Sequence, residues 1–391
     1  MAEYAGRITQ AHQAARESGL DGWLLYDFRH SNPILWEITG SRLHSTRRLF
    51  LWLPARGEPV LLAHQVDAAH FASWGVPVRP YRGREDLLRQ VRDILAGVAR
   101  VAMEYSPLGA LPTLSWVDGG TLEMVRSHGV EVASSAPLVQ AALGRLTGWE
   151  LASHRYAAEK LGLIVQDAFA WIGEKVRDGM DEYAVCAFIR ERFRQERLWT
   201  DEGPIVAVNE HSGDPHYVPS PQGSSPIRPG DWVLIDLWAR QEDGIFGDIT
   251  WTAYVGNQAP EEHRRVFQVV TVARDMALDF IRQAVQGGRF PQGWEVDRVA
   301  RDYIRAAGYG DAFTHRLGHS LGSVVHGYGA NLDSFETQDV RELAPGTAFT
   351  IEPGIYLPRF GVRSEIDVYL RESGPEVTSP VQREVVTIRV R

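Results

Sequence analysis

Two hydrophobic patterns follow each other along the chain, and the first is a series of short apolar runs. Runs of about four to eight residues rich in Val, Leu, Phe, Trp and Tyr predict buried β-strands. One such run, 22–28, and a later amphipathic stretch, 85–98, show the alternation of strand and helix that is typical of an α/β domain. The other runs that predict strands in this part are 47–54, 59–64 and 100–105.

From residue 148 onward the pattern changes to longer helices followed by pairs of strands. Apolar residues at helical spacing predict a helix over 150–176. The order helix, helix and β-hairpin then occurs twice, and the helical stretches 179–198 and 293–310 each precede a hairpin. The two copies share this order and not their sequence, so they support an internal repeat only as a pattern. We therefore predict two domains, 1–147 and 148–391, joined by a short linker.

Length and composition agree with two domains and exclude several classes of protein. The chain has 391 residues, more than one domain usually holds, and 44% of them are hydrophobic. It carries 41 basic and 50 acidic residues, net −9, without a basic cluster, so we expect no nucleic-acid partner. No basic start precedes an apolar stretch, and no run of about 18 apolar residues occurs, which predicts a cytoplasmic protein without a membrane segment. The one cysteine, Cys186, excludes a disulfide framework, and its apolar neighbours predict burial.

Four carboxylates stand in or beside predicted strands, where Asp and Glu are disfavoured. Asp236 and Asp248 flank the turn-rich stretch QEDGIFG, so a hairpin would place them on adjacent strands. Glu352 and Glu365 flank LPRFG in the same way, at a nearly equal offset along the chain. Between the two pairs lies His319, in a glycine-rich segment with three histidines. Taken singly, each residue is explained as a turn, surface or core residue, but their joint occurrence indicates one site.

The chemistry of such a cluster points to metal ions. Clustered carboxylates repel one another, and when they are desolvated they cannot all stay ionised unless a cation compensates them. Oxygen ligands with one imidazole suit hard or borderline divalent ions, so we expect Mn²⁺ first, with Co, Zn or Fe as alternatives. Two ions about 3.5–4 Å apart that share carboxylates fit five ligands better than one ion does.

The motifs HRLGHSLGSVVHG, TIEPGIY and GVRSE, with the aspartates in LIDLWA and GDITWT, resemble those of the pita-bread metallopeptidases. Within that family, the motifs resemble specifically those of Xaa-Pro dipeptidases (prolidases) and Xaa-Pro aminopeptidases. The resemblance covers essentially the whole chain. It implies an α+β pita-bread catalytic domain with an internal pseudo-twofold repeat over 148–391, preceded by a smaller creatinase-like α/β domain over 1–147. It also implies a homodimer.

The resemblance further implies roles for individual residues. Asp236 and Asp248 would bind one metal ion, and His319 and Glu352 would bind the other. Asp248 and Glu365 would bridge the two ions. The residues implied to contact the substrate or support the site are His216, His326, His315 and Arg363.

The implied substrate is a small peptide with proline at its second position, and the implied reaction is hydrolysis of its X-Pro bond. A hydroxide held between the two ions would attack the carbonyl carbon, and Glu352 would carry the proton. His216 and His326 would stabilise the tetrahedral oxyanion or donate towards the leaving nitrogen.

The sequence departs from the family pattern at Trp238, where a glycine is usual. Strand alternation would point this side chain to the same face as Asp236. Our hypothesis is that Trp238 narrows the pocket and favours dipeptides, and hydrophobic packing is the alternative. The residue that binds the substrate's C-terminal carboxylate is not identified by the motifs. The candidates for it are Arg341, Arg47, Arg48, Arg29 and His30.

The sequence also contains features of other classes of protein. The segment 318–322 fits G-x-S-x-G, the nucleophile motif of α/β-hydrolases, which needs an acid and then a histidine after the serine. After Ser320 only His326 follows, with no acid between them, which argues against a serine esterase. The alternatives that stay open are an Xaa-Pro aminopeptidase acting on longer peptides, and a creatinase-like metal-free hydrolase or binding protein. Methionine aminopeptidase ranks lower, because its catalytic domain usually stands without the first domain.

Overall fold

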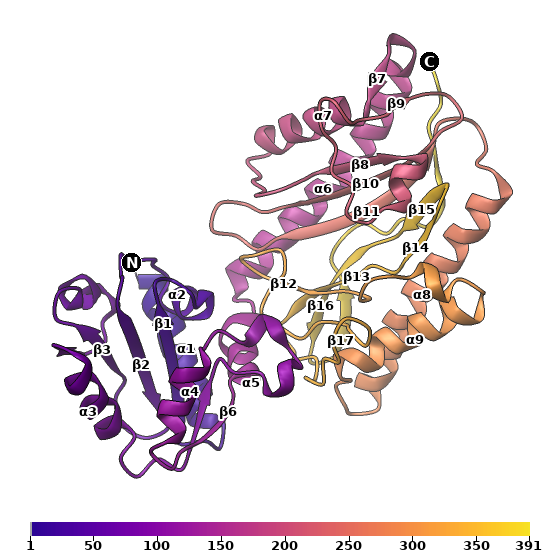
Figure 1. The fold of residues 1–391 in the computed structure, drawn as a ribbon. Coiled ribbons are helices and arrows are strands. Elements are labelled where there is room, and N and C mark those ends of the chain that lie inside the picture. Colours follow the sequence, from indigo (N-terminus) through magenta and orange to yellow (C-terminus); the bar gives the residue numbers. More distant parts are fainter. Residues whose placement is uncertain (1) are drawn as a thin grey trace. The chain divides into compact units, whose positions relative to one another are not determined.

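The structure is a computed structural model that describes residues 2–391. The chain forms two compact units, divided between Leu143 and Gly144. Figure 1 shows the N-terminal unit in indigo and purple, and the second unit in magenta to yellow. The domain boundary expected after residue 147 falls at the start of helix α6 (Gly148–Lys175). Thr147 caps this helix by accepting a hydrogen bond from the backbone N–H of Glu150.

The N-terminal unit contains a six-stranded sheet in the order β4-β3-β2-β1-β5-β6. The central strand β1 (Gly22–Phe28) runs antiparallel to β2 (Arg48–Pro54) and parallel to β5 (Arg100–Met103). The other strands are β3 (Val60–His64), β4 (Val78–Tyr81) and β6 (Glu131–Ser134). The helices are α1 (Ala2–Glu17), α2 (Pro33–Thr39), α3 (Arg84–Ile94), α4 (Gly119–Arg126) and α5 (Ala136–Val139). The four strands and the helix expected from the apolar runs correspond to β1, β2, β3, β5 and α3.

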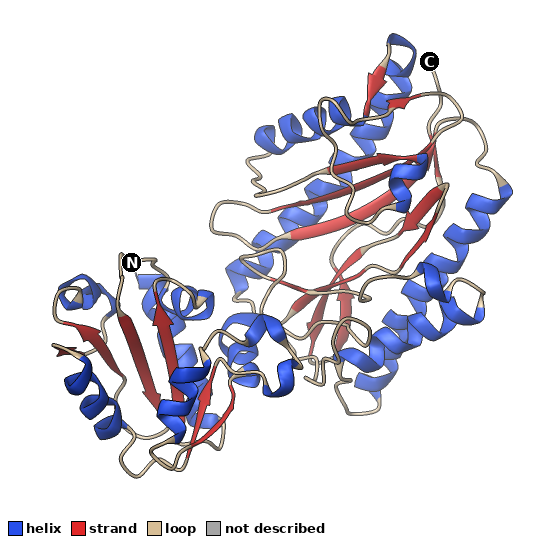
Figure 2. Cartoon of the chain, viewed as in Figure 1, coloured by secondary structure: helices blue, strands red, loops and turns tan. Residues whose placement is uncertain are grey.

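The second unit is built from helices on the outside and strands on the inside (Figure 2). One sheet has the order β18-β11-β10-β8 and another has the order β12-β13-β16-β17. The helices besides α6 are α7 (Glu182–Gln195), α8 (Glu261–Gln286) and α9 (Gly293–Ala306). The strands of the first sheet are β8 (Ile205–Val208), β10 (Trp232–Ala239), β11 (Gly247–Tyr254) and β18 (Val386–Thr387). Those of the second are β12 (Ser320–Leu321), β13 (Ala348–Ile351), β16 (Ile366–Arg371) and β17 (Gly374–Val377). The short pairs are β14 (Gly354–Leu357) with β15 (Phe360–Arg363), and β7 (Met180–Asp181) with β9 (Pro226–Ile227).

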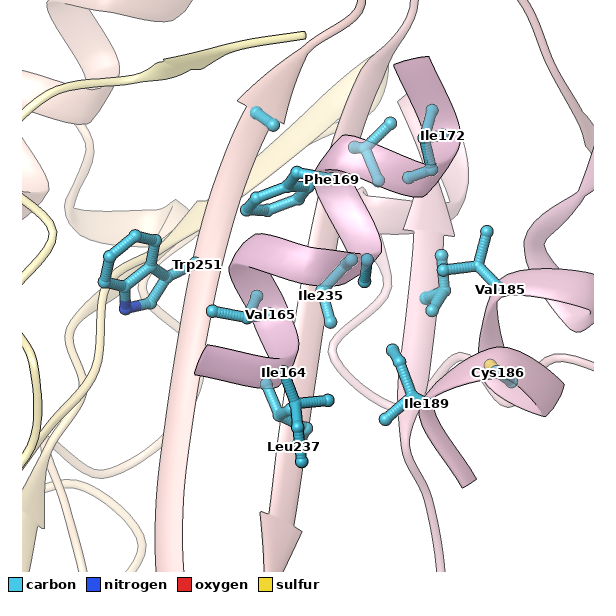
Figure 3. Packing of buried hydrophobic residues seen from close by; sticks show 14 of the residues in the cluster. Ile164, Val165, Phe169, Ile172, Val185, Cys186, Ile189, Ile235, Leu237 and Trp251 are labelled. Atoms are coloured by element: carbon cyan, nitrogen blue, oxygen red, sulfur yellow. The ribbon is translucent and has the colours of Figure 1, made fainter. Parts of the chain in front are cut away.

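Each half of the second unit has its own apolar core. In the first half, α6 packs on β10 and β11 and α7 packs on α6 and β8, and their core includes Phe169, Ile189 and Ile235 (Figure 3). Cys186 lies in this core and is fully buried, as its neighbours in the sequence predict. In the second half, α8 and α9 pack against β13, β15 and β16 through residues such as Val270. Burying one such side chain contributes about 1.5–3 kcal/mol. The expected order of helix, helix and hairpin is therefore present twice.

A close backbone approach at Gly361 joins the hairpin β14–β15 to the loop after β8. The amide of Gly361 donates to Oγ of Ser212 at 2.8 Å, and its carbonyl accepts from Nε1 of Trp232 at 2.8 Å. A Cβ at position 361 would lie 1.8 Å from the carbonyl oxygen of Ser212. No side chain fits there without moving one of the two segments.

Gly361→Ala is therefore expected to lower the free energy of unfolding by about 3 kcal/mol, the upper end for overpacking a filled interior. The measurement is urea unfolding followed by circular dichroism. The matched control is Gly148→Ala, because a Cβ there meets nothing within 4 Å and the residue lies in α6. The control should be as stable as the parent or more stable. Equal stability of the two variants would contradict the close approach.

Candidate metal centre

The first carboxylate pair lies on one hairpin, as the sequence predicts. Strands β10 and β11 are antiparallel, with Asp236 opposite Thr250 and Trp238 opposite Asp248. Residues that face each other across an antiparallel pair point to the same side of the sheet. Since Asp236 and Trp238 are two positions apart on one strand, all four side chains share that side.

The second carboxylate pair flanks the hairpin β14–β15. Glu352 follows the end of β13, and its amide donates to the carbonyl of Leu317 at 2.8 Å. Glu365 lies between β15 and β16, and its amide donates to the carbonyl of Thr250 at 3.2 Å. These two backbone bonds tie the second pair to the histidine segment and to β11. The two halves of the unit thus meet at the carboxylates.

Three buried side chains come together as a potential metal-binding group. Ligand atoms of Asp248, His319 and Glu365 all lie within 4.8 Å of one another. Nε2 of His319 lies 3.6 Å from Oδ2 of Asp248 and 3.3 Å from Oε1 of Glu352. The other ring nitrogen, Nδ1, lies 3.2 Å from the carbonyl of Ser320. A carbonyl at Nδ1 fixes the imidazole so that Nε2 faces the carboxylates.

Arg363 links Asp236 to this group. Its Nη2 donates to Asp236, its Nε donates to Oγ1 of Thr250 at 2.9 Å, and its Nη1 donates to the hydroxyl of Tyr356 at 3.2 Å. The same hydroxyl lies 2.7 Å from Nε2 of His315. The predicted ligands and the predicted residues His315 and Arg363 therefore belong to one buried network.

Threonines and a further aspartate hold the ligands and were missed by the sequence analysis. Thr250 donates to Oε2 of Glu365 at 2.7 Å, and Thr350 donates to Oε1 of Glu352 at 3.1 Å. Asp367 accepts from the backbone amide of Asp248, with both its oxygens at 3.2 Å. Such outer partners orient ligands in metal sites. Thr250 and Thr350 stand at β-strand positions where threonine is common, so their sequence gave no signal.

The electrostatics of the cluster call for a cation. Burial and then the neighbouring carboxylates hold the pKa of Asp248 well above its usual range. Burial likewise raises the pKa of Glu365 well above its usual range, with Glu352 adding to it. Burial raises the pKa of Glu352 itself to about 7. Oδ1 of Asp248 is buried and has no hydrogen-bond partner among the described residues. A divalent ion would supply both the missing partner and the missing charge, so these residues fit a metal.

The remaining predicted histidines differ in their placement. The ring of His326 meets the ring of His319 edge to face, with the centroids 4.5 Å apart. His216 lies in the loop after β8 and is exposed, and its backbone amide donates to Oδ1 of Asp214 at 2.9 Å. Among the described residues, no hydrogen bond, ion pair or ring contact joins the His216 side chain to the carboxylates. The structure thus brings His326 to the cluster and leaves His216 apart.

A buried glutamate, also missed, organises the loop that carries His216. Glu182 is fully buried and accepts from the backbone amides of Val208 and Ser225, each at 2.7 Å. It also accepts from the hydroxyl of Tyr217, and Nδ1 of His211 lies 2.9 Å from it. Because Glu182 opens α7, its sequence position suggests only a favourable charge at a helix N-terminus.

Trp238 packs at the edge of the cluster. A Cβ on Gly203 would lie 2.6 Å from its indole ring, so the ring packs closely against that backbone. It also packs against a small apolar group that includes Phe246, Leu321 and Ala348. Its Nε1 is buried without a partner among the described residues. These contacts agree with packing, and they leave the narrowing of a pocket as a hypothesis.

Arg341 does not have free donors for a substrate carboxylate. It is buried, and it donates to Asp339 through Nε at 2.9 Å and through Nη2 at 2.6 Å. Its Nη1 donates to the carbonyl of Tyr328 at 3.0 Å. Arg341 therefore forms a structural ion pair with Asp339 and does not offer these donors to a substrate carboxylate. The other four candidates, Arg29, His30, Arg47 and Arg48, belong to the N-terminal unit.

The serine motif has no esterase geometry. Ser320 lies in the short strand β12, and its Oγ accepts from the amide of Gly329 at 2.9 Å. Within the described part of the chain, no helix follows Ser320, whereas the nucleophile elbow needs a strand, a sharp turn and a helix. This agrees with the rejection made from the sequence.

Comparison with known proteins decides the family. The model of metallopeptidase family M24 matches residues 155–372, which contain all five predicted ligands. The chain belongs to metallopeptidase family M24. The M24 match covers most of the second unit and leaves the N-terminal unit outside it.

Relatives of the M24 chain include proteins named as dipeptidases. The crystal structure of dipeptidase PepE from Mycobacterium ulcerans superposes with a TM-score of 0.76 at 26% identity, over 99% of this chain and 98% of that one. A dipeptidase structure from Pyrococcus horikoshii gives a TM-score of 0.67 at 26% identity, over 97% and 99%. An Xaa-Pro dipeptidase of Lactobacillus delbrueckii is 31% identical over 62% of this chain and 61% of its own length. The predicted α+β pita-bread fold and the resemblance to the prolidase family are confirmed. No described helix of the M24 chain is long and apolar enough to cross a membrane.

Proposed function

We propose that this M24 chain is a metal-dependent Xaa-Pro dipeptidase. The observation that carries the proposal is the buried group of Asp248, His319 and Glu365, because an M24 fold with competent ligands is what a metallopeptidase needs. The names of the relatives support a small peptide as substrate, since PepE is named a dipeptidase and the Lactobacillus protein an Xaa-Pro dipeptidase. Proline at the second position of the substrate is part of the proposal.

The proposed cofactor is a pair of divalent ions, with Mn²⁺ first. Five residues would hold them: Asp236, Asp248, His319, Glu352 and Glu365. When bound, such ions lower the pKa of water and make a nucleophile available near neutral pH. The oxygen-rich ligand set favours Mn²⁺ over softer ions.

The protein's own groups then have separate tasks in the proposed reaction. Glu352, whose Oε1 lies 3.3 Å from Nε2 of His319, would take a proton from the nucleophile and return it to the leaving nitrogen. His326 stands beside the cluster and would donate to the oxygen of the tetrahedral intermediate, the role that the resemblance also gives to the exposed His216. Arg363 holds Asp236 and Tyr356 in place, and Tyr356 in turn orients His315.

The direct test uses the metal-stripped protein with Ala-Pro, Ala-Ala and Ala-Pro-Ala, each with and without Mn²⁺, and follows release of free amino acid. Cleavage of Ala-Pro alone, dependent on Mn²⁺, is the expected result. Cleavage of Ala-Pro-Ala as well would move the assignment to an Xaa-Pro aminopeptidase. Absence of cleavage with every metal tried would overturn the proposal and favour a creatinase-like hydrolase or a binding protein.

Trp238→Gly tests the proposed preference for dipeptides. If the indole narrows the pocket, the variant should gain about 10-fold or more in kcat/KM for Ala-Pro-Ala relative to Ala-Pro. This is about the discrimination between two substrates that one contact in a pocket supplies. The measurement is the ratio of the two kcat/KM values. A folded variant with an unchanged ratio would assign Trp238 to packing alone.

The proposal also includes a cytoplasmic homodimer. Light scattering of the purified protein tests the oligomeric state, since one chain has a mass of 43.8 kDa. A monomer at micromolar concentration would remove the dimer from the proposal and leave the metal chemistry untouched.

A further inference from the structure

A buried ion pair on α9 faces the segment 313–317, which leads to His319. Asp297 and Arg301 are four residues apart, so they lie on one face of the helix, and both are buried. Nε of Arg301 lies 2.9 Å from Oδ2 of Asp297, and Nη2 lies 2.9 Å from Oδ1. Such a two-pronged contact fixes the orientation of both side chains. The sequence motifs give neither residue a role.

The same ion pair binds the backbone of this segment. The segment forms neither helix nor strand, so its backbone groups need partners from elsewhere in the fold. Nη1 of Arg301 donates to the carbonyl of Phe313 at 3.0 Å, and Nη2 donates to the carbonyl of His315 at 2.7 Å. The amide of Leu317 donates to Oδ1 of Asp297 at 2.8 Å. One ion pair thus holds three backbone groups of the segment.

Asp297 also binds a second segment, which pairs with the first. Its Oδ2 accepts a hydrogen bond from the hydroxyl of Ser334. Two residues before Ser334, the backbone of Leu332 exchanges hydrogen bonds with the backbone of Gly318, at 2.9 and 3.3 Å. The carboxylate of Asp297 therefore holds both sides of the backbone pairing that immediately precedes His319.

This backbone is in turn bonded to two of the predicted metal ligands. The carbonyl of Leu317 accepts from the amide of Glu352 at 2.8 Å. The amide of His319 donates to Oγ1 of Thr350 at 3.0 Å, and its carbonyl accepts from the amide of Thr350 at 2.8 Å. A Cβ at Gly318 would lie 2.1 Å from the carbonyl oxygen of Thr350, so no free space separates the two backbones. A displacement of Leu317 would therefore displace Glu352 and His319.

Two phenylalanine rings cover the guanidinium of Arg301. Its Cζ lies 4.1 Å from the centroid of the Phe313 ring and 4.5 Å from that of Phe335. Phe335 is 54% exposed, so it covers the guanidinium on a side that faces solvent. Exclusion of water strengthens the attraction between a guanidinium and a carboxylate. The rings therefore help to keep the ion pair in one arrangement.

We propose that the ion pair of Asp297 and Arg301 positions Glu352 and His319, and thereby sets the affinity for the metal ion that these two residues would bind. This inference rests on the proposed function, because it concerns the same ion. The pair acts through the backbone, so both of its members are positioning residues. Desolvation offsets much of the attraction within a buried ion pair, which favours a role in fixing one arrangement over a role in stability alone.

Arg301→Lys in the full chain is the main test. Lysine keeps the charge but cannot form the planar fork that binds Asp297 and two carbonyls together. In calorimetric titration well below the unfolding temperature, the affinity for Mn²⁺ should fall by about 10- to 100-fold, the range for loss of an outer partner of a metal ligand. The visible absorption of the Co²⁺-loaded protein should also change, because it depends on the arrangement of the ligands. A folded variant with the affinity and absorption of the parent would overturn the inference.

Hydrogen exchange of the Leu317 amide in the metal-free protein measures the positioning without metal or activity. Because this amide donates to Asp297, its exchange should become about 10-fold faster in Arg301→Lys. Arg305→Lys is the matched control, since Arg305 is an exposed arginine of the same helix that pairs with Asp302. The control should keep the exchange rate and the Mn²⁺ affinity of the parent. Equally slow exchange in both variants would mean that the ion pair does not hold the segment.

Phe335→Ala keeps the inference testable if Arg301→Lys does not fold, since half of the phenylalanine ring is already exposed. Loss of the ring opens the guanidinium to water, and the affinity for Mn²⁺ should fall by about threefold, the value of one exposed cation–π contact. Val340→Ala is the control, because Val340 is also 54% exposed. Equal affinity for Mn²⁺ in these two variants would contradict the inference.

The results separate this inference from the proposed function. A parent protein that binds Mn²⁺ and does not cleave Ala-Pro contradicts the dipeptidase, while the affinities of the variants still decide the role of the ion pair. A parent that cleaves Ala-Pro, with variants that keep its Mn²⁺ affinity, contradicts only the role of the ion pair. A parent that binds neither Mn²⁺ nor Co²⁺ contradicts both.

Discussion

Replacing Glu365 by glutamine is expected to remove activity and high-affinity metal binding together. Glu365 is buried at the point where the two halves of the catalytic unit meet, and one of its oxygens lies within 4.8 Å of ligand atoms of Asp248 and His319. Glutamine keeps the shape and loses the charge. Loss of an outer partner of a metal ligand lowers metal affinity or activity by about 10- to 100-fold. Loss of a proposed bridging ligand should have a larger effect, and we expect kcat/KM for Ala-Pro to fall by about 10³-fold.

Calorimetric titration with Mn²⁺ measures the binding part of this prediction, and release of free proline measures the catalytic part. Glu262→Gln is the matched control, because Glu262 is an exposed residue of α8 and, among the described residues, its ion pair is with Arg359 at 2.8 Å. The control should bind Mn²⁺ and cleave Ala-Pro as the parent does. If Glu365→Gln kept both properties, the five-residue ligand set would be wrong at this position.

The metal-free protein should lose stability as the pH rises from about 6.5 to 8, through the folded pKa of Glu352, and added Mn²⁺ should reverse the trend. Burial holds the pKa of Asp248 and that of Glu365 well above the usual range, and it raises the pKa of Glu352 from 4.5 to about 7. The folded chain therefore keeps protons that the unfolded chain has already lost. The contribution to stability is complete below about pH 4.5 and is lost as the pH rises through the folded values, by about 1.4 kcal/mol per pH unit for each proton.

The chosen pH window separates this effect from that of the histidines. Burial lowers the pKa of His315 from 6.5 to about 3, so this histidine costs stability only as the pH falls below 6.5. Thermal unfolding at about pH 6.5, 7.25 and 8, with a chelator or with Mn²⁺, measures the trend. The double variant Asp248→Asn, Glu365→Gln should show a shallower slope without metal and no reversal with it. An equal slope in parent and variant would mean that these carboxylates do not titrate in this range.

Local pattern predicted the parts of the site that depend on a single hairpin. Strand alternation and a turn-rich stretch predict the positions and the face of Asp236 and Asp248, which lie on adjacent strands. The same reasoning placed Glu352 and Glu365 around the hairpin β14–β15. A polar residue in an apolar strand is a strong local signal, since burial there requires a partner or a function.

Contacts between distant segments escaped the sequence analysis. Asp367 accepts a hydrogen bond from the backbone amide of Asp248, which lies 119 positions away in the sequence. The sequence alone shows Asp367 only as one more acid near a strand. Glu182 accepts from the amide of Ser225, 43 positions away, and a helix N-terminus explains its charge without that role. The place of Arg341 in the order of motifs made it a candidate for binding the substrate carboxylate. Only the folded chain shows that its guanidinium donates to Asp339 instead. The choice of partner by a long, flexible or buried polar side chain depends on which segments fold together.

The two separate apolar cores of the second unit fix the relative position of the two carboxylate pairs in the proposed site. Asp236 and Asp248 are fixed to the core of α6 and α7, whereas Glu352 and Glu365 are fixed to the core of α8 and α9. The distance between the two acidic pairs is therefore set by how one half seats on the other. An ion bound by both pairs would cross-link the two halves. A substitution deep in either core, far from any ligand, would then lower activity by shifting one carboxylate pair relative to the other and weakening the binding of the ion.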